Sequence, residues 1–447
     1  MVTRLVRGGH VLTMNDAHDV IADGAVAIDG EVITAVGTWS DLRAAHPDAE
    51  VGGSATALVM PGMINAHQHL TGDRLVRSVI PDTITSHEAI FDWSVPIHAA
   101  HTERDDELSA LLSLHEALCN GVTTTIEAGT VAHPAAVARA MRTIGARGSV
   151  GCWGWDVEGG PFAAPADEVL ARQRAVVEMA PPGGRVEGWV TLVGHDLMSD
   201  DLVVRSSALA RELGVRITFH ISPTTADADA YLARTGRRPL RHLHDLGVLG
   251  PHVLLAHAVH VDDDELDCLA ASGAAVAACP WAYLRLAQRV TVGGRHDDML
   301  RRGVPVALGS DAENASDAID PIRTGALFVG LLRDRSGDPA EFSATTALRL
   351  LTIDGARAIG MADRIGSLEV GKQADVVTLR TDGPEWMPRS PRPELQLLWA
   401  SSGASVDEVH VAGRQVVAGR RCTTIDVPAL AAEAQARQAV LGQTIRP

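Results

Sequence analysis

The sequence predicts an α/β protein: a (β/α)8 TIM barrel with a small β-sandwich domain built from both termini. Two observations carry this prediction. Eight short apolar strands alternate with helical stretches across residues 59–364, which is the count of such a barrel. Strand-rich segments broken by glycine and aspartate turns flank this region, at residues 1–58 and 365–425. Residues 426–447 are alanine-rich and predict a C-terminal helix and tail.

The two ends of the chain share one pattern of short β-rich runs. Asp29-Gly30 lies between two of these runs and is a hairpin signal. Similar runs occur at residues 374–379 and 406–417, far along the chain. We therefore expect the two ends to build one small domain together. The N-terminal runs are Val11–Met14, Gly24–Ile28 and Val32–Val36.

The region between the two ends contains the expected barrel strands. Segments such as Asp105–Asn120 and Ser206–Leu213 separate them and carry apolar residues at helical spacing. The first strand begins at Val59. The other expected strands are Val122–Ile126, Arg147–Gly151, Trp189–Val193, Val215–Phe219, Val253–Ala256, Ala274–Ala278 and Val304–Leu308.

Length and composition indicate an enzyme of the cytoplasm. The 447 residues are 46% hydrophobic, enough for one large and one smaller domain, and no apolar run is long enough to span a membrane. A net charge of -17 disfavours nucleic acid and anionic membranes as partners, so we expect a small-molecule substrate. The five cysteines form no CxxC pair, and the N-terminus lacks the apolar core of a signal peptide.

Titratable side chains follow most of the expected barrel strands. His67 and His69 end the first strand one residue apart, so both point to the same face. Imidazole is a common ligand of catalytic metals, whose sites typically have about three protein ligands plus a water. Barrels carry their chemistry at these strand ends, so the pattern indicates a catalytic metal site. The other strand-end groups are Glu127, His195, Asp196, His220, His257 and Asp311.

A single lysine, Lys372, occurs in the whole chain, and it lies late, in a Gly-Lys-Gln-Ala-Asp turn. A metal site bridged by a modified lysine in the barrel is therefore excluded. We expect a mononuclear site unless a carboxylate bridges two metals.

Five short motifs occur in the order typical of one enzyme family, and together they span nearly the whole chain. With them the chain resembles the amidohydrolase superfamily, specifically its cytosine deaminase and chlorohydrolase branch. The resemblance implies a homo-oligomer, dimeric or higher. The motifs are Pro61–His69, Gly121–Thr125, Leu255–His260, Gly309–Asp311 and Gly366–Asp375.

The resemblance also assigns metal ligands and catalytic roles. It implies one divalent metal, zinc by default with iron, manganese or cobalt open, held by His67, His69, His220 and Asp311. Asp311 would also take the proton of the attacking water. His257 would not be a direct ligand, but would orient the hydroxide or the developing oxyanion.

Substrate contacts are expected at His195 and in the long segment after the first strand. His195 lies where such enzymes contact substrate, although a rim histidine bonded to a loop is the alternative. Trp93 and His98 are candidates for the pocket wall, with packing as the alternative role of Trp93.

The chain departs from the family pattern at the fifth strand. Deaminases of this branch carry His-x-x-Glu there, whereas this chain has His220-Ile221-Ser222-Pro223. Proline cannot transfer a proton through its side chain, so another group must act or ring protonation is not needed. Glu127, His195 and His257 are the candidate acids. Asp227 and Asp229 are close in sequence, but their alternating Ala-Asp pattern predicts exposure to solvent.

The sequence thus favours a metal-dependent hydrolase that acts on a non-peptide C–N bond of a small cyclic or heteroaromatic molecule. Amides, ureas and carbamates need no ring protonation, and the absent glutamate favours them. Deamination of an aminoheterocycle, or displacement of a ring chloride, is the alternative. A second alternative, from another class, is a barrel that keeps the metal site but only binds, or is non-hydrolytic.

Overall fold

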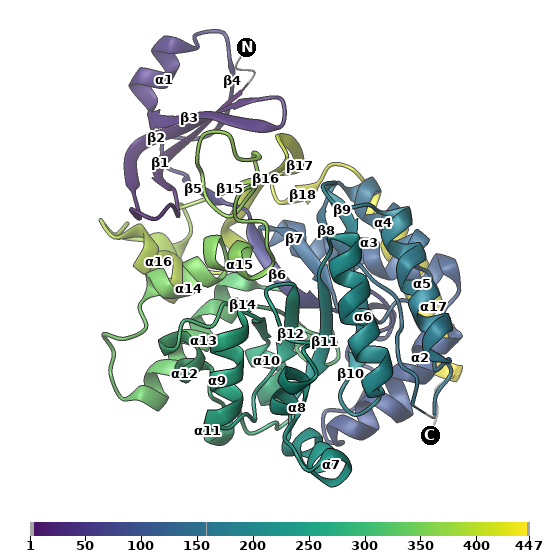
Figure 1. Ribbon diagram of the computed structural model, residues 1–447. Helices are drawn as coiled ribbons and strands as arrows, with labels where there is room; N and C mark the ends of the chain where they lie inside the picture. The colour runs from purple at the N-terminus through teal and green to yellow at the C-terminus, as the bar shows by residue number, and fades with distance from the viewer. Residues whose placement is uncertain (1–3, 158, 445–447) are drawn as a thin grey trace.

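The computed structural model describes residues 4–157 and 159–444 and confirms the α/β class (Figure 1). Parallel strands form two sheets, with strand orders β6-β7-β8-β9 and β10-β11-β12-β13-β14. Their strands are β6 (Met63–Gln68), β7 (Val122–Glu127), β8 (Arg147–Val150), β9 (Val186–Gly188), β10 (Val190–Gly194), β11 (Ile217–Ile221), β12 (Val253–His257), β13 (Ala275–Ala278) and β14 (Val306–Leu308).

Main-chain hydrogen bonds link the two parallel sheets at both ends. Trp189, between β9 and β10, donates its amide to the carbonyl of Val150 on β8, at 3.0 Å. At the other end, the amide of Asp311 donates to the carbonyl of His67 at 2.9 Å, and Gln68 and Asp311 form a parallel bridge. The links bring strand ends that are far apart in sequence to a common edge.

Helices lie outside the parallel strands (Figure 1). Their ends follow simple capping rules: Thr102 and Asp105 form a capping box at the start of α3, and Gly214 ends α6 in the left-handed region. The helices of this region are α2 (Val95–Ala100), α3 (Glu103–Cys119), α4 (Pro134–Ile144), α5 (Ala166–Met179), α6 (Asp200–Leu213), α7 (Thr225–Thr235), α8 (Pro239–Asp245), α9 (Asp263–Ser272), α10 (Pro280–Arg285), α11 (Val290–Gly293), α12 (His296–Arg301), α13 (Pro321–Ser336), α14 (Ala344–Leu350) and α15 (Ile353–Ala358), with a 3-10 helix η1 (Arg74–Val76) and a π-helix η2 (Glu88–Ser94).

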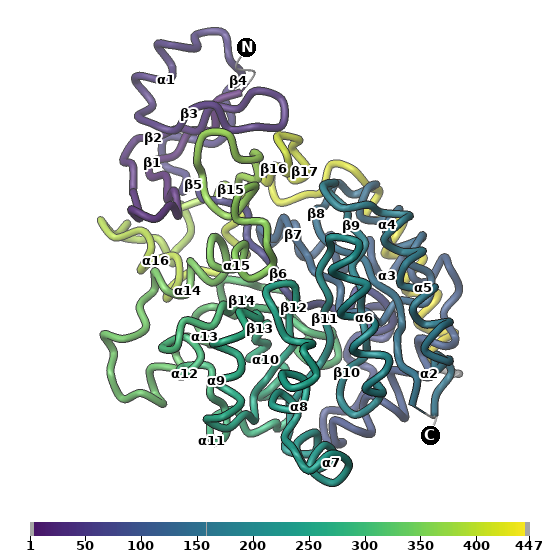
Figure 2. The backbone as a smooth tube through the Cα atoms, in the orientation of Figure 1, coloured from purple at the N-terminus to yellow at the C-terminus, as the bar shows by residue number. Residues whose placement is uncertain are grey.

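Strands from both ends of the chain form one nine-stranded mixed sheet (Figure 2). Its order is β18-β17-β16-β15-β5-β1-β2-β3, with β4 beside β1, so β5 and β15 join the N-terminal and C-terminal parts. The arrangement as a β-sandwich stays a prediction. The elements are β1 (Arg4–Leu12), β2 (Val20–Asp29), β3 (Val32–Thr38), α1 (Trp39–Ala45), β4 (Glu50–Gly53), β5 (Leu58–Pro61), β15 (Val376–Leu379), α16 (Pro393–Ala400), β16 (Val406–Val411), β17 (Arg414–Ala418) and β18 (Arg421–Cys422).

The run expected to begin the barrel at Val59 is in fact two strands. β5 pairs with β1 and β15 in the nine-stranded sheet, and β6, the first of the parallel strands, begins only at Met63. Gly62 separates them, and a Cβ at this position would collide with the side chain of Thr123 on β7. Glycine therefore lets the chain pass from one sheet to the other against a neighbouring strand.

A buried ion pair joins the parallel strands to the terminal sheet. The guanidinium of Arg147, on β8, donates two hydrogen bonds of 3.0 Å to the carboxylate of Asp375, which precedes β15. The amide of Ala412 donates a third bond to this carboxylate, at 2.8 Å. Arg147 is fully buried, so the pair stands in a dry environment where losing either partner is costly.

The C-terminal helix α17 (Val427–Thr444) packs on α3 and η1. Arg437 donates to the carboxylate of Asp105 on α3, with Nε and Oδ1 2.6 Å apart, and Leu430 and Leu441 are buried. No helix in the described parts of the chain is long and apolar enough to cross a membrane.

Candidate metal and substrate site

Three histidines and an aspartate from different strand ends converge. His69 Nε2 lies 3.2 Å from Asp311 Oδ1 and 3.3 Å from His220 Nε2, and His67 Nε2 lies 3.7 Å from Asp311 Oδ1. Ligand atoms about 2.0–2.1 Å from a tetrahedral zinc lie roughly 3.3 Å apart, so the spacing suits one such ion. The four predicted metal ligands are therefore brought together.

Hydrogen bonds on the far side of the rings leave the converging nitrogens available to a metal. His220 Nδ1 donates to the carbonyl of Val193 at 2.7 Å, and His69 Nδ1 is bonded to the hydroxyl of Thr130 at 2.8 Å. Both ring nitrogens of His67 are buried without a hydrogen-bond partner among the described residues. Burial holds the pKa of His67 and of His220 well below the usual value, so both are neutral at physiological pH. Neutral imidazoles and an unpartnered buried nitrogen are what a divalent metal requires.

His257 lies beside this cluster. Its Nε2 is 3.9 Å from Asp311 Oδ2, and its buried Nδ1 has no hydrogen-bond partner among the described residues. Burial lowers its pKa to about 4. His195, His257 and Asp311 have backbone φ angles of 53°, 78° and 66°, a left-handed conformation that is uncommon outside glycine. Strained backbone of this kind concentrates at functional sites, where it aims side chains.

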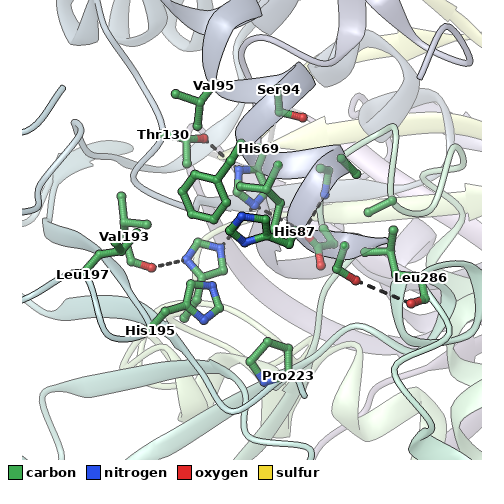
Figure 3. A pocket seen from close by; sticks show the side chains of 18 of the residues that line it. His69, His87, Ser94, Val95, Thr130, Val193, His195, Leu197, Pro223 and Leu286 are labelled. Carbon is green, nitrogen blue, oxygen red and sulfur yellow. Dashed lines mark hydrogen bonds and ion pairs between the residues drawn. The ribbon is translucent and has the colours of Figure 1, made fainter. Parts of the chain in front are cut away.

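A cavity of about 480 Å³ opens beside the cluster (Figure 3). Most of its wall surface is apolar, although about half of the side chains that line it are polar. His69, His220, His257 and Asp311 line it on one side. No lysine or arginine of residues 4–157 and 159–444 is among the residues that line it. The apolar wall includes Ile80, Ile90, Phe91, Val95, Trp155, Val193, Leu197, Pro223, Leu286 and Ala315.

The expectation that Asp227 faces solvent is wrong. Asp227 is buried near the start of α7, lines the cavity, and places Oδ2 3.0 Å from His195 Nδ1. The amide of Ser222 donates to the same oxygen at 2.7 Å. Burial lowers the pKa of His195, but the charge and hydrogen bond of Asp227 outweigh this and raise it. Asp229, two residues on, is exposed as expected.

Three predicted residues have different placements. His98 lines the cavity and donates Nδ1–H to the carbonyl of Thr130 at 3.0 Å. Glu127 is fully buried, is not among the lining residues, and accepts the amide of Gly129 at 2.6 Å and that of Thr130 at 3.4 Å. It thereby supports the turn that holds His69. Trp93 is half-buried against the core and is also absent from the lining.

Sequence reasoning missed Asp73 and Asn314, which line the cavity on loops after β6 and β14. Each follows a predicted ligand by a few residues, His69 and Asp311 respectively, and that spacing was the only signal. It also assigned no lining role to Ile90 and Phe91, which line the cavity from the π-helix η2.

Comparison with known proteins places the chain in a family. The model of the amidohydrolase family matches residues 58–416, and a bacterial imidazolonepropionase-like composite domain matches residues 24–49. A 5-methylthioadenosine/S-adenosylhomocysteine deaminase of Nitratidesulfovibrio vulgaris is 32% identical over 435 residues, covering 96% of this chain and 95% of the relative. A relative with the same activity in Symbiobacterium thermophilum is 32% identical over 394 residues, covering 86% of each chain.

Solved structures share the whole fold. An adenosine deaminase of Xanthomonas campestris with bound zinc superposes with a TM-score of 0.93 at 26% identity, covering 99% of each chain. The zinc-bound atrazine chlorohydrolase of Arthrobacter aurescens superposes with a TM-score of 0.87 at 24% identity, covering 98% of this chain and 100% of that one. The second likeness is evidence of fold alone.

These matches confirm the resemblance that the strand-end motifs predicted. They also confirm an enzyme class, because the relatives are hydrolases and deaminases that act on C–N bonds other than peptide bonds. The chain belongs to the amidohydrolase family.

Proposed function

We propose that the protein is a zinc-dependent deaminase that replaces an amino group on a small heteroaromatic ring by oxygen. The observation that carries this is the convergence of His67, His69, His220 and Asp311 on one side of a largely apolar cavity. Curated relatives at 32% identity are deaminases of an adenine nucleoside, which supports deamination over the other reactions of the family. A flat ring fits between apolar walls, with its reacting carbon towards the ligand cluster.

The cavity residues supply the proton handling. A zinc ion held by the three histidines and Asp311 would contribute Lewis acidity, which lowers the pKa of a water ligand towards neutrality. Asp311 takes a proton from the attacking water and delivers it to the departing amine. Attack at the ring carbon sends the electron pair of its C=N bond to the adjacent ring nitrogen. His257, whose Nε2 lies 3.9 Å from Asp311 Oδ2, relays the second water proton to that nitrogen as the new C=O bond forms. Asp227 fixes Nδ1 of His195, so that Nε2 is the ring nitrogen available to the substrate.

We also infer the finer architecture. The main-chain links at Trp189 and at Asp311 support closure of the two parallel sheets into one (β/α)8 barrel, with β9 and β10 as one interrupted strand. The nine-stranded sheet supports a composite domain of both termini, extended to Pro61 by β5. Homo-oligomer formation stays a prediction.

Hydrolysis of a cyclic amide, urea or carbamate is the second candidate. Pro223 favours it, because this residue lines the cavity at the position where deaminases of the branch carry a proton-transferring glutamate. Such substrates need no protonation of an aromatic ring, so Asp311 alone could move the protons.

Product mass separates the candidates. Zinc-loaded protein is incubated with aminopurines, aminopyrimidines, aminotriazines, cyclic amides, ureas and carbamates, with released ammonia measured in parallel. Exchange of an amino group for oxygen with ammonia release supports deamination. Addition of water with ring opening would replace it with cyclic C–N hydrolysis. A fully metal-loaded protein without turnover of any compound would contradict both.

A further inference from the structure

Asp73 is a buried carboxylate with no ion-pair partner among the described residues, and its charge acts on the imidazoles of His69 and His98. It is 2% exposed and lines the cavity, on the loop that follows the ligand strand β6. Its Oδ1 accepts from the hydroxyl of Ser94 and from Nδ2 of Asn314, both at 3.3 Å. No residue of 4–157 or 159–444 donates a hydrogen bond to its Oδ2 or forms an ion pair with it. Desolvating a carboxylate with two long, neutral bonds is unfavourable unless a ligand adds a donor.

Asn314 presents a second unpartnered acceptor at the same place. Its Nδ2 donates to Asp73 twice, to the carboxylate Oδ1 at 3.3 Å and to the main-chain oxygen at 3.4 Å. The bond fixes the orientation of the amide and turns Oδ1 away from Asp73. This Oδ1 is buried, has no hydrogen-bond partner among the described residues, and belongs to a side chain that lines the cavity. Two neighbouring residues of the wall thus each keep one oxygen without a donor among the described residues, Oδ2 of Asp73 and Oδ1 of Asn314.

The other carboxylates of the cavity are already compensated. Asp227 is bonded to His195, Asp311 lies among the ligand histidines, and Asp196 pairs with Arg234 at 2.9 Å. No lysine or arginine lines the cavity, burial lowers the pKa of His98 to about 4, and His195 already has Asp227 as its partner. The cavity wall therefore favours hydrogen-bond donors on the substrate and disfavours a negatively charged substrate group.

We propose that Asp73 and Asn314 form a specificity subsite that binds a hydrogen-bond donor group of the substrate, N–H or O–H, and that excludes substrates with an anionic group there. This rests on the proposed function, since it assumes a heteroaromatic molecule in the cavity. It assigns the substrate class more narrowly: a neutral or cationic ring compound that directs a donor at the Asp73 side.

The test uses one aminoheterocycle scaffold with four substituents at the same ring position: amino, hydroxyl, methyl and carboxylate. kcat/KM is measured on the zinc-loaded enzyme, and dissociation constants are measured by calorimetry for every compound. A hydrogen bond to a charged group predicts a preference of about 10- to 100-fold for the amino or hydroxyl compound over the methyl compound. The carboxylate compound should bind more weakly than the methyl compound. Whether amino or hydroxyl is preferred identifies the donor.

Asp73→Asn tests the assignment to this residue, because it removes the charge and keeps the shape. The preference for a donor should collapse and the carboxylate compound should bind better than to the wild type. Asp196→Asn is the matched control: it also removes a carboxylate from the cavity wall, but one already paired with Arg234, so the preference should persist. Zinc content and thermal unfolding are measured for both variants.

Equal binding of donor and methyl compounds by the wild type would overturn the subsite, as would tightest binding of the carboxylate. A preference left unchanged by Asp73→Asn would overturn the assignment to Asp73. If no compound is turned over but calorimetry still shows the preference for a donor, the proposed reaction is wrong and the subsite is supported. If all four compounds are turned over with equal kcat/KM, the subsite is wrong and the proposed reaction is supported.

Discussion

Replacing Asp227 by asparagine tests how the cavity holds His195. In the wild type both carboxylate oxygens face His195 Nδ1, at 3.0 and 3.2 Å, and Oδ2 also accepts the amide of Ser222 at 2.7 Å. Asparagine keeps one oxygen. If that oxygen remains on the Ser222 amide, it still accepts Nδ1–H of His195, because Oδ2 makes both contacts. The NH2 group then replaces Oδ1, and the negative charge that raises the pKa of His195 is lost.

The expected loss follows from the missing charge. Burial then acts on His195 without the opposing charge of Asp227, so the pKa of the ring falls while its position is kept. Loss of a carboxylate that orients a histidine typically costs about 10- to 100-fold in activity, which is about 1.4–2.8 kcal/mol of transition-state stabilisation. The loss should fall on kcat/KM with zinc content unchanged, because His195 is not among the ligands.

The prediction is checked by steady-state kinetics with a substrate that the wild type deaminates, and zinc content is measured by mass spectrometry. Asp229→Asn is the matched control: it is the same substitution two residues along α7, at an exposed side chain. An Asp227→Asn effect no larger than that of Asp229→Asn would refute the reasoning. Loss of zinc in Asp227→Asn would also refute it, because the defect would then lie in the ligand cluster.

Three further outcomes are expected. His220→Gln should reduce bound zinc from about one per chain to background and abolish turnover, measured by metal analysis; full zinc would remove His220 from the ligand set. Asp375→Asn leaves the guanidinium of Arg147 buried without its counter-charge and should lower the free energy of unfolding by about 3–5 kcal/mol, measured by urea denaturation. A loss as small as that caused by replacing an exposed aspartate would contradict the burial of the pair. Burial would raise the pKa of Glu116, but the hydrogen bond from Arg77 and nearby arginine charges lower it below the usual value. This stabilisation is present above the unfolded pKa of about 4.3 and is lost as pH falls through the lower folded pKa. The free energy of unfolding of the wild type should therefore fall more on acidification than that of Glu116→Gln. Parallel curves of unfolding free energy against pH would contradict this.

Much of the ligand cluster follows from sequence because strand periodicity and strand ends are local properties. His67 and His69 share a face through the two-residue repeat, and His220, His257 and Asp311 each follow a mostly apolar run. Once the strands lie parallel, these ends can meet. Chain order and spacing therefore predicted a metal site at the strand ends, and the family resemblance selected its four ligands.

Loop and helix orientation could not be predicted in this way. Asp227 and Asp229 have the same local pattern, and only the direction in which α7 leaves the strand decides which is buried. Glu127 ends its strand as predicted, but its side chain turns to the backbone of Gly129. Asp73 meets Asn314 only because two loops far apart in sequence close over one cavity. Such contacts depend on the whole fold, and no single segment encodes them.

The nine-stranded sheet can be completed only late in synthesis, because its strands come from both ends of the chain. Val59 on β5 pairs with Thr378 on β15, roughly 300 residues later in the chain. A ribosome adding about 5–20 residues per second needs about 15 s to one minute to produce that partner. During this interval the nascent N-terminal strands have an open edge at β5, where another chain could pair. The parallel strands emerge in between, so the catalytic region can fold before its terminal sheet is complete, and the exposed edge is the stage at which chaperones would protect this protein.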